Sequence, residues 1–308
     1  MTKVSVVIPT YNRANVLPRA IDSVLQQTHE NIELIVVDDS STDNTREVVE
    51  SYNDNRIRYT RLDSNSGANT ARNTGINISS GDYIAFLDSD DEWLPSKISK
   101  QLNTFKYANN STGLVYTGRK YIGQDDELNA VVTPKLQGDV SGNMLADNFV
   151  GTFSTALIKK SILEVVEPPD ESFDSGQDWE FFTRISFLYE FGVVDEPMVK
   201  CYTQQNNRIS SNHDPRSKYS RFRDKFESEI TDNGLITRRK IHSKHMFRLG
   251  YSYTRRGDMR SGIYALCRSI LFYPLNTLAY VHLISCLGGA WTNQFLRKIK
   301  RKILRYYY

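Results

Sequence analysis

The sequence predicts an α/β fold, in which a mainly parallel sheet is flanked by helices and followed by a helical C-terminal extension. Two observations carry this prediction. Short, β-branched apolar runs alternate with amphipathic helical patterns through residues 1–120, as in sheets built with right-handed crossover connections. The charge then reverses along the chain, because residues 1–200 hold 18 Lys/Arg and 30 Asp/Glu whereas residues 201–308 hold 21 and 6. This asymmetry predicts different partners for the two parts.

Strands are expected where apolar runs are short and continuous, because strands buried on both faces show no polar alternation. In chain order these runs are Val4–Pro9, Ile32–Val37, Ile57–Leu62, Tyr83–Leu87 and Gly113–Tyr116. Helices are expected between them, where apolar residues recur at helical spacing. They are Val16–Leu25, with Asn15 as N-cap and Pro18 in the first turn, then Asp43–Tyr52, Ala68–Ile78 and Pro95–Tyr107.

Residues 216–308 are expected to form a basic, mostly helical region behind a catalytic domain of residues 1–215. One set of residues has the spacing of a single tetratricopeptide helix pair, which cannot bury its own face and should dock on the catalytic domain. The set is Leu249, Gly250, Tyr253, Gly262, Ser269 and Pro274.

The tail Gln294–Tyr308 contains six cations, no anion and interleaved apolar residues. Two interpretations stay open: a solvated C-terminal helix, or an interfacial helix on an anionic membrane leaflet. We expect no nucleic-acid partner. The apolar segment Leu278–Trp291 is too short to span a bilayer, so it packs in a core or lies in the interface.

The composition is that of a globular protein, with 39% hydrophobic residues. No apolar stretch reaches the length of about 18 residues that a spanning helix needs, and the N-terminus lacks a signal-peptide pattern. The cysteines, Cys201, Cys267 and Cys286, are odd in number and fit a reducing compartment. We therefore expect a cytoplasmic protein, peripheral on the inner face of the cell membrane.

Polar side chains follow three of the expected strands. The segments are Thr10–Arg13, Asp38–Ser41 and Asp88–Asp91. Because ligands of open α/β sheets bind beyond the carboxyl ends of the strands, we expect these side chains to line one binding edge. Crowded carboxylates repel one another unless a cation joins them, and Mg²⁺ or Mn²⁺ prefers oxygen ligands completed by substrate phosphates. The pattern predicts a metal–diphosphate site.

Several other phosphate and metal sites are excluded by their own motifs. The chain has no Gly-x-x-x-x-Gly-Lys-Ser/Thr loop and no Gly-x-Gly-x-x-Gly after the first strand. The Asp88–Asp91 run has Trp93 where a calcium loop of the EF-hand type needs glycine. A phosphatase with a strand-end Asp-x-Asp nucleophile stays open, although it does not account for Tyr11 or the Asp38-Asp39 pair. A nucleotidyltransferase also stays open, although the Gly-rich activating loop expected after its first strand is absent.

Five segments in order resemble glycosyltransferase family 2. They are VSVVIPTYNR, VVDDSSTD, GANTARNTGI, GDYIAFLDSDDEW and GQDWEFFTR, and the resemblance covers residues 3–215. It implies the Rossmann-like GT-A fold, a nucleotide-sugar donor and inversion of the anomeric centre.

The resemblance also implies roles for donor-side residues. Pro9, Thr10 and Tyr11 match the segment that borders the nucleotide base, and Asp39 matches a carboxylate that accepts from the uracil ring or the ribose. Arg72 matches a basic residue near the donor phosphates. We expect Asp38 to be structural.

Asp88-Ser89-Asp90 matches the family's Asp-x-Asp signature. Asp90 is then the metal ligand, while Asp88 and Ser89 lie on the donor side, with Asp88 contacting the ribose or, through water, the metal. A late His213 is the second candidate ligand. Asp91 is expected to cap the following helix.

Asp178 is the candidate catalytic base. It follows Gln177, which stands where family members commonly have glutamate, and it precedes a helical stripe. An inverting transfer is one in-line displacement and needs one carboxylate within reach of the acceptor hydroxyl. Glu180 is given no role.

These features predict an Mn²⁺- or Mg²⁺-dependent enzyme that moves one sugar from a nucleoside-diphosphate sugar, with UDP favoured by Asp39. The acceptor is expected to be a lipid-linked, polyprenyl-carried or cell-envelope glycan. A processive synthase is disfavoured. Such enzymes carry a Gln-x-x-Arg-Trp signature, and Gln204 and Gln205 are not followed by the Arg-Trp pair at that spacing. A nucleotidyltransferase or phosphatase, or an inactive membrane-associated scaffold, remains the alternative.

Overall fold

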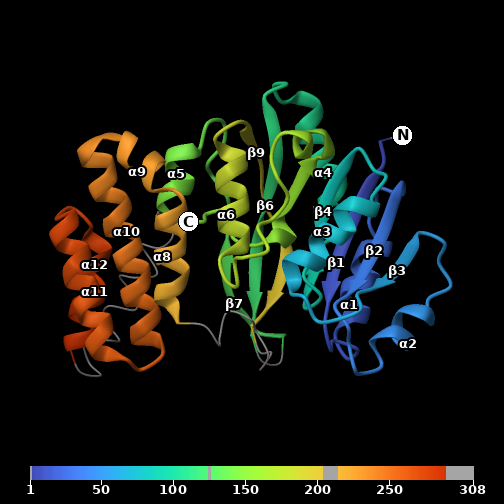
Figure 1. The fold of residues 1–308 in the computed structure, drawn as a ribbon, viewed down its shortest axis with the longest axis horizontal. Coiled ribbons are helices and arrows are strands. Elements are labelled where there is room, and N and C mark those ends of the chain that lie inside the picture. The colour runs from blue at the N-terminus through green and yellow to red at the C-terminus, as the bar shows by residue number, and fades with distance from the viewer. Residues whose placement is uncertain (1, 124–125, 204–213, 289–308) are drawn as a thin grey trace. The chain divides into compact units, whose positions relative to one another are not determined.

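The protein is described by a computed structural model that covers residues 2–123, 126–203 and 214–288. Within these residues lies a nine-stranded sheet of order β3-β2-β1-β4-β8-β6-β9-β5, with β7 paired to β6. Strands β1, β2, β3 and β4 are parallel, and β1 to β3 lie side by side at the blue end in Figure 1. The strands are β1 (Val4–Thr10), β2 (Ile32–Asp38), β3 (Ile57–Arg61), β4 (Tyr83–Phe86), β5 (Asp91–Trp93), β6 (Thr112–Ile122), β7 (Leu128–Val132), β8 (Ala156–Lys159) and β9 (Glu190–Tyr202).

The first half of the sheet follows the predicted pattern of continuous apolar runs. Every residue of β1 and β2 is buried, which confirms that these strands are covered on both faces. Their side chains join one core with residues of α1 and α4. The segment VSVVIPT forms a central strand because neither of its two faces is exposed to solvent.

The helices of this half also match the prediction closely. They are α1 (Leu17–Leu25), α2 (Thr45–Glu50), α3 (Ala68–Ile78) and α4 (Lys97–Tyr107). The expected N-cap is wrong: Val16, not Asn15, precedes α1, and no side chain caps it, although Pro18 does lie in the first turn. Helix α3 packs against β1 so tightly that a Cβ at Gly75 would lie 2.3 Å from Val7 Cγ1.

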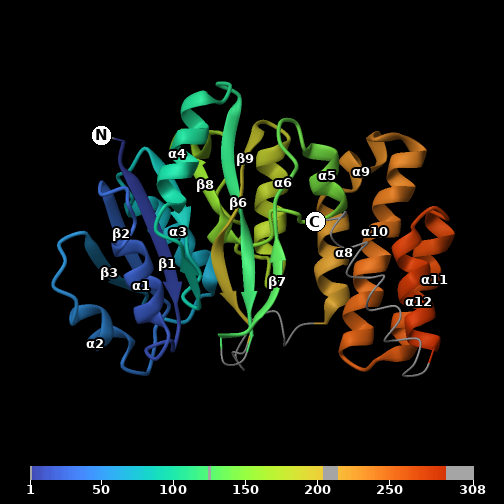
Figure 2. The ribbon, with the colours of Figure 1, turned by 180° about the vertical axis from the view of Figure 1, so that it is seen from behind.

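The second half of the sheet differs more from the prediction. Strand β6 is longer than the expected Gly113–Tyr116 run, and it pairs with β9 in parallel and with β7 and β8 antiparallel. Figure 2 shows β6 and β7 side by side from behind. The segment 148–159 is a strand only in β8, preceded by a short 3₁₀ helix, η2 (Phe153–Thr155). After a second 3₁₀ helix, η3 (Lys160–Glu164), α6 (Gln177–Ser186) leads into β9.

The described residues divide into two compact units, of which the first contains 2–140 and 150–203 and the second contains 141–149 and 214–288. The second unit is helical. Its helices are α5 (Ser141–Ala146), α8 (Pro215–Lys225), α9 (Glu227–Asp232), α10 (Gly234–Arg255), α11 (Met259–Phe272) and α12 (Thr277–Leu287). No pattern in the sequence indicates that α5 joins this unit. The domain boundary at 215/216 stays a prediction.

Contacts within the second unit explain how α5 is held. His245 Nε2 on α10 donates to the carbonyl oxygen of Leu145 at 2.9 Å, and Arg248 pairs with Asp147. Burial lowers the pKa of His245 to about 3, so this side chain is a neutral structural donor. Helices α10 and α11 approach closely where Gly250 faces Leu266 and Gly262 faces Thr254.

No helix in the described ranges is long and apolar enough to cross a membrane. Helix α12 buries Ala279 and His282 but exposes Tyr280, Ile284 and Leu287. The basic tail Gln294–Tyr308 lies outside the described residues, as does the end of the Leu278–Trp291 segment.

Candidate active site

The sheet brings the predicted polar strand ends to one edge. Strand β1 lies between β2 and β4, parallel to both, with Thr10 opposite Asp38 and Val7 opposite Phe86. The turns that follow β1, β2 and β4 therefore leave the sheet side by side. Alternation of strand and crossover helix dictates this result, because parallel neighbours end in the same direction.

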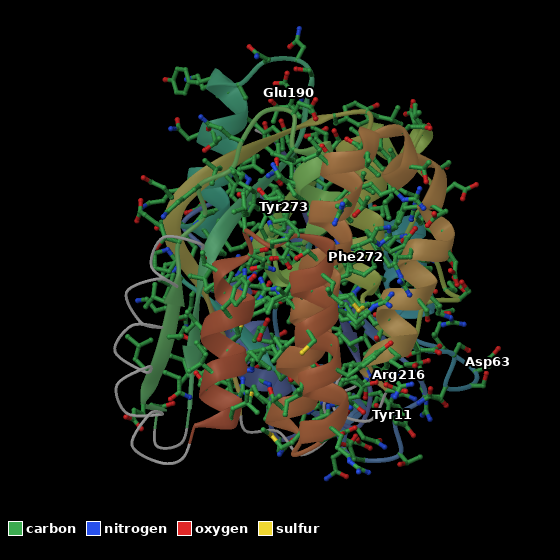
Figure 3. The ribbon with its side chains drawn as sticks, turned by 90° about the vertical axis from the view of Figure 1, so that its left-hand side faces the viewer. Tyr11, Asp63, Glu190, Arg216, Phe272 and Tyr273 are labelled. Carbon is green, nitrogen blue, oxygen red and sulfur yellow. The ribbon has the colours of Figure 1, made fainter. Side chains whose placement is uncertain are left out.

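The end of β1 has a buried part and an exposed part. Pro9 and Thr10 are buried in the strand, and Thr10 Oγ1 has no hydrogen-bond partner among the described residues. Tyr11, which follows, is 43% exposed and is labelled in Figure 3. A buried hydroxyl without a partner is costly, so Thr10 Oγ1 is suited to meet a polar ligand atom at this edge.

The two carboxylates after β2 have different surroundings. Asp38 accepts from the backbone N–H of Ser41 at 2.9 Å and from the Tyr59 hydroxyl at 2.6 Å, which fits the structural role expected for it. Asp39 accepts from the backbone N–H groups of Ser66 and Gly67, at 2.6 and 2.8 Å. It therefore fixes the loop before α3. A carboxylate has about four acceptor positions, so these two bonds leave room for a ligand donor.

Arg72 lies at the centre of the site. This residue is 5% exposed, and its guanidinium stacks 4.1 Å from the ring centroid of Phe153. One nitrogen, Nη1, donates to Asn69 Oδ1 and Gln177 Oε1, each at 3.0 Å. The other, Nη2, donates to Asp88 Oδ1 at 2.8 Å. One buried cation thus joins α3, the turn after β4 and the first residue of α6.

The Asp88-Ser89-Asp90 turn is held from several sides. Asp88 Oδ2 accepts from Thr152 Oγ1 at 2.9 Å, and its backbone N–H donates to Ser154 Oγ at 3.1 Å. Ser89 is buried, and Asp90 is half-buried. The turn is therefore rigid on the Asp88 side.

An arginine on α1 supports the far end of the same turn. Arg19 donates from Nη2 to the carbonyl oxygen of Asp90 at 2.9 Å, and its guanidinium lies 3.4 Å from the ring centroid of Tyr202. Both ends of the Asp-x-Asp segment are consequently fixed by arginines that come from different helices.

The expectation that Asp91 caps a helix is wrong. Asp91 begins β5, opposite Cys201 of β9, and only 4% of it is exposed. Burial raises the pKa of Asp91, and the negative charges of Asp88 and Asp90 raise it further. Helix α4 begins only at Lys97.

Asp178 lies in the first turn of α6. The helix follows Gly176, whose left-handed backbone (φ 75°) suits glycine, and the half-buried Asp178 accepts through Oδ1 from the backbone N–H of Trp179 at 2.7 Å. Glu180 is fully buried and paired with Arg184 at 2.5 Å, which is a packing role. Gln177, the residue before Asp178, accepts a hydrogen bond from Arg72. The same guanidinium also donates to Asp88.

The acidic turn fits a metal site that a substrate completes. In the part of the chain that the structure describes, no group of three His, Cys, Asp or Glu side chains is arranged to hold a metal. Mg²⁺ and Mn²⁺ commonly take one or two carboxylates and complete their shell with phosphate and water oxygens. Asp90 and Asp88 supply hard oxygen atoms of this kind. The other candidate ligand, His213, lies outside the described residues.

Sequence reasoning missed four supporting side chains. Asn69 lies in the GANTARNTGI segment, three residues before Arg72 on α3, and Thr152 and Ser154 lie just before β8. Helical spacing alone could have paired Asn69 with Arg72. Nothing in the sequence pointed to Arg19, because its contact depends on how α1 packs.

The fold and this acidic edge define a GT-A glycosyltransferase. The chain belongs to glycosyltransferase family 2: the family model described as Glycosyl transferase family 2 matches residues 5–166. This membership selects the glycosyltransferase among the alternatives that the sequence had left open.

Curated relatives carry glycosyltransferase names. The putative teichuronic acid biosynthesis glycosyltransferase TuaG of Bacillus subtilis is 42% identical over 68% of this chain and 82% of its own length. The Escherichia coli UDP-Glc:alpha-D-GlcNAc-diphosphoundecaprenol beta-1,3-glucosyltransferase WfgD is 38% identical over 43% of this chain and 51% of its length. An uncharacterized glycosyltransferase of Rickettsia felis is 31% identical over 76% of this chain, which spans only 39% of that relative.

Solved structures share the fold at low identity. Residues 1–349 of Staphylococcus aureus TarS in complex with UDP-GlcNAc give a TM-score of 0.65 at 19% identity, covering 97% of this chain and 92% of that one. The mannosyltransferase PcManGT of Pyrobaculum calidifontis, in complex with GDP-Man and Mn²⁺, gives 0.51 at 18% identity, covering 98% and 81%.

Proposed function

We propose that this protein is a metal-dependent, inverting glycosyltransferase that moves one sugar from a UDP-sugar to a lipid-linked or cell-envelope glycan. The observation that carries the proposal is the pair of bonds from one buried arginine. Arg72 joins Asp88, on the donor side, to Gln177, the neighbour of the candidate base. A single displacement needs the donor and the base in a fixed relative position. Arg72 provides this, because it holds Asp88 on the donor side and the residue next to Asp178.

The donor nucleotide is proposed to bind at the ends of β1 and β2. The exposed ring of Tyr11 offers an aromatic face to the base, and Thr10 Oγ1 offers an unused hydroxyl. Asp39 keeps acceptor capacity for a base or ribose donor. The names of two similar proteins support uridine, since WfgD is named for UDP-Glc and TarS is crystallised with UDP-GlcNAc.

The metal is proposed to bind at Asp90, with Asp88 contributing directly or through water. When bound, such an ion neutralises the charge that builds on the departing nucleoside diphosphate. The Mn²⁺ in the complex of PcManGT, which shares the fold, supports this expectation. The chain's own part is to hold the turn still, through Arg72 on one side and Arg19 on the other.

Asp178 is proposed to act as the general base. Its carboxylate accepts the proton of the acceptor hydroxyl while that oxygen bonds to the anomeric carbon and the bond from this carbon to the diphosphate breaks. No covalent enzyme intermediate is needed, and the anomeric configuration inverts.

The acceptor is proposed to be a polyprenyl-carried or other envelope glycan, with the enzyme cytoplasmic and peripheral on the inner membrane face. Support comes from the names of TuaG, which mentions teichuronic acid, and WfgD, which mentions a diphosphoundecaprenol acceptor. Residues 1–215 would form the catalytic domain and 216–308 the helical attachment.

A transfer assay with labelled donors tests this proposal. We would offer UDP-glucose, UDP-GlcNAc and GDP-mannose, with Mn²⁺, to a GlcNAc-diphosphopolyprenol acceptor and to envelope lipid extracts. Labelled lipid formed from a UDP-sugar, lost in Asp178→Asn and retained in Asp174→Asn, is the expected result; Asp174 is an exposed carboxylate four residues earlier. Equal transfer by both variants would remove Asp178 from the mechanism, and label from GDP-mannose alone would remove uridine.

A further inference from the structure

The second unit carries a basic groove that the transferase reaction does not use. The groove encloses about 460 Å³ between the first half of α10 and the end of α11. It is called the α10–α11 groove below. Its polar and aromatic lining consists of Arg238, Arg239 and His242 from α10 and Arg268 and Phe272 from α11.

Helical spacing places these side chains on two facing stripes. On α10, Leu235, Arg238 and His242 recur at intervals of three and four residues, and on α11 Arg268, Leu271 and Phe272 do the same. The two stripes are fixed against each other by Arg239. Its guanidinium donates to the carbonyl oxygens of Phe272 at 2.8 Å and of Leu271 at 3.1 Å. These carbonyl groups lie in the last turn of α11, where cationic side chains are favourable. Figure 3 labels Phe272 and Tyr273 in this region.

The groove has an excess of positive charge. Arg238 pairs with Glu227 at 3.0 Å, but these side chains are 38% and 52% exposed, so the pair is weak. Arg239 bonds only to carbonyl oxygens, and Arg268 lies 5.2 Å over the Phe272 ring with no carboxylate partner in the described part of the chain. Burial lowers the pKa of His242, and the positive charges of Arg223 and Arg238 lower it further, as expected beside a cluster of arginines.

Exposed aliphatic side chains lie at the same end of the helix pair. Leu235 and Ile236 at the start of α10 are 72% and 68% exposed, and Leu271 and Leu275 at the end of α11 and just beyond it are 69% and 72% exposed. Single exposed aliphatic side chains are ordinary, but here Leu235 and Leu271 line a cationic groove, and Ile236 and Leu275 adjoin them in the sequence. An acidic glycan would satisfy the arginines and leave these leucines in water, whereas an anionic bilayer satisfies both.

We propose that the α10–α11 groove docks on the surface of an anionic lipid bilayer, with its arginines at the lipid phosphates and its leucines in the acyl boundary. The proposal concerns described residues of the second unit alone. It rests on the proposed attachment of residues 216–308 to a membrane and names the surface that makes the contact. It needs neither the tail beyond residue 288 nor any step of sugar transfer, so vesicle binding and transfer activity can fail separately.

Vesicle sedimentation of the full chain tests the docking. The vesicles are phosphatidylcholine alone, or mixed with phosphatidylglycerol at about 3:1. The test variant is Arg238→Gln with Arg268→Gln, one change on each helix. The matched control is Arg255→Gln with Arg260→Gln, two exposed arginines at the opposite end of the same helices. Circular dichroism and the melting shift with UDP verify that each variant is folded and keeps its donor site.

The groove variant should partition roughly 25-fold more weakly into the anionic vesicles, because each basic residue near such a surface contributes about fivefold. The control should change much less, and wild type should bind phosphatidylcholine alone poorly. Leu271→Ser with Leu275→Ser should also weaken vesicle binding while leaving its salt dependence intact. Equal losses in groove and control variants would overturn the proposal. Normal vesicle binding by the leucine variant would also overturn the proposal. The arginines alone would then account for binding, as they would for a soluble polyphosphate, and no contact with the acyl boundary would be needed.

Discussion

Replacing Arg72 by lysine separates two roles that the structure and the sequence suggest for it. Lysine keeps the charge and the ion pair with Asp88 but cannot fork, so the bonds to Asn69 Oδ1 and Gln177 Oε1 are lost. Two buried hydrogen bonds at about 1 kcal/mol each predict roughly 2 kcal/mol of destabilisation. For a unit of this size, that corresponds to a drop in Tm of roughly 4–8 °C.

The kinetic result should distinguish positioning from direct phosphate binding. If Arg72 holds Asp88 and the start of α6 in register, Arg72→Lys should lower kcat by roughly 10²-fold with little change in the donor KM. Arg58→Lys is the matched control, because that side chain is 49% exposed and lies 3.8 Å from its partner Glu33. A variant with normal Tm and kcat but a raised donor KM would refute the positioning argument and restore Arg72 as a phosphate ligand.

Three further predictions follow from single contacts. Asp178→Asn should lower kcat by roughly 10²–10⁴-fold while the UDP-dependent melting shift stays normal; loss of both would mean a binding defect instead. Gly75→Ala should lower the free energy of unfolding, measured by urea denaturation, by about 1–3 kcal/mol, because the new methyl group would collide with Val7. Gly67→Ala is the comparison, because its methyl group would meet no atom and only its left-handed backbone would be strained. His245 has its pKa lowered from 6.5 to about 3, so the unfolded chain takes up this proton first. Stability is therefore full above pH 6.5 and falls as the pH drops towards 3, by about 2 kcal/mol at pH 5. His245→Gln should flatten that pH dependence, and an unchanged slope would contradict the assignment.

The first half of the fold was predictable because its signals are local. Strands β1 and β2 are uninterrupted apolar runs, and α3 spans Ala68–Ile78, the range that periodicity predicts. Strand β9 was missed because Asp195, Glu196 and Pro197 interrupt its apolar pattern. It forms nevertheless, since pairing with both β5 and β6 outweighs the local preference.

The site was predictable as a set of strand ends, but not as a network. Asp39, Asp88 and Asp90 could be found because each follows an apolar run. Asp91 was assigned to a helix cap because an acidic residue shortly before a helical pattern looks like one, whereas pairing with β9 decides its place. The bond from Arg72 to Gln177 spans 105 residues, and no spacing rule reaches that far.

The central claim is that the edge formed by β1, β2 and β4 binds a nucleoside diphosphate with a metal. Thermal unfolding with UDP, GDP, TDP and CMP, each with and without Mn²⁺, tests it most directly in wild type, Asp90→Ala and Asp63→Ala. Asp63 is an exposed carboxylate and serves as the control. At 100 times its Kd a ligand adds about 2.7 kcal/mol of stability, a readily measured shift. The account predicts an Mn²⁺-dependent rise in Tm with UDP that Asp90→Ala loses and Asp63→Ala keeps. No rise with any nucleotide, or a rise that Asp90→Ala retains in full, would contradict it.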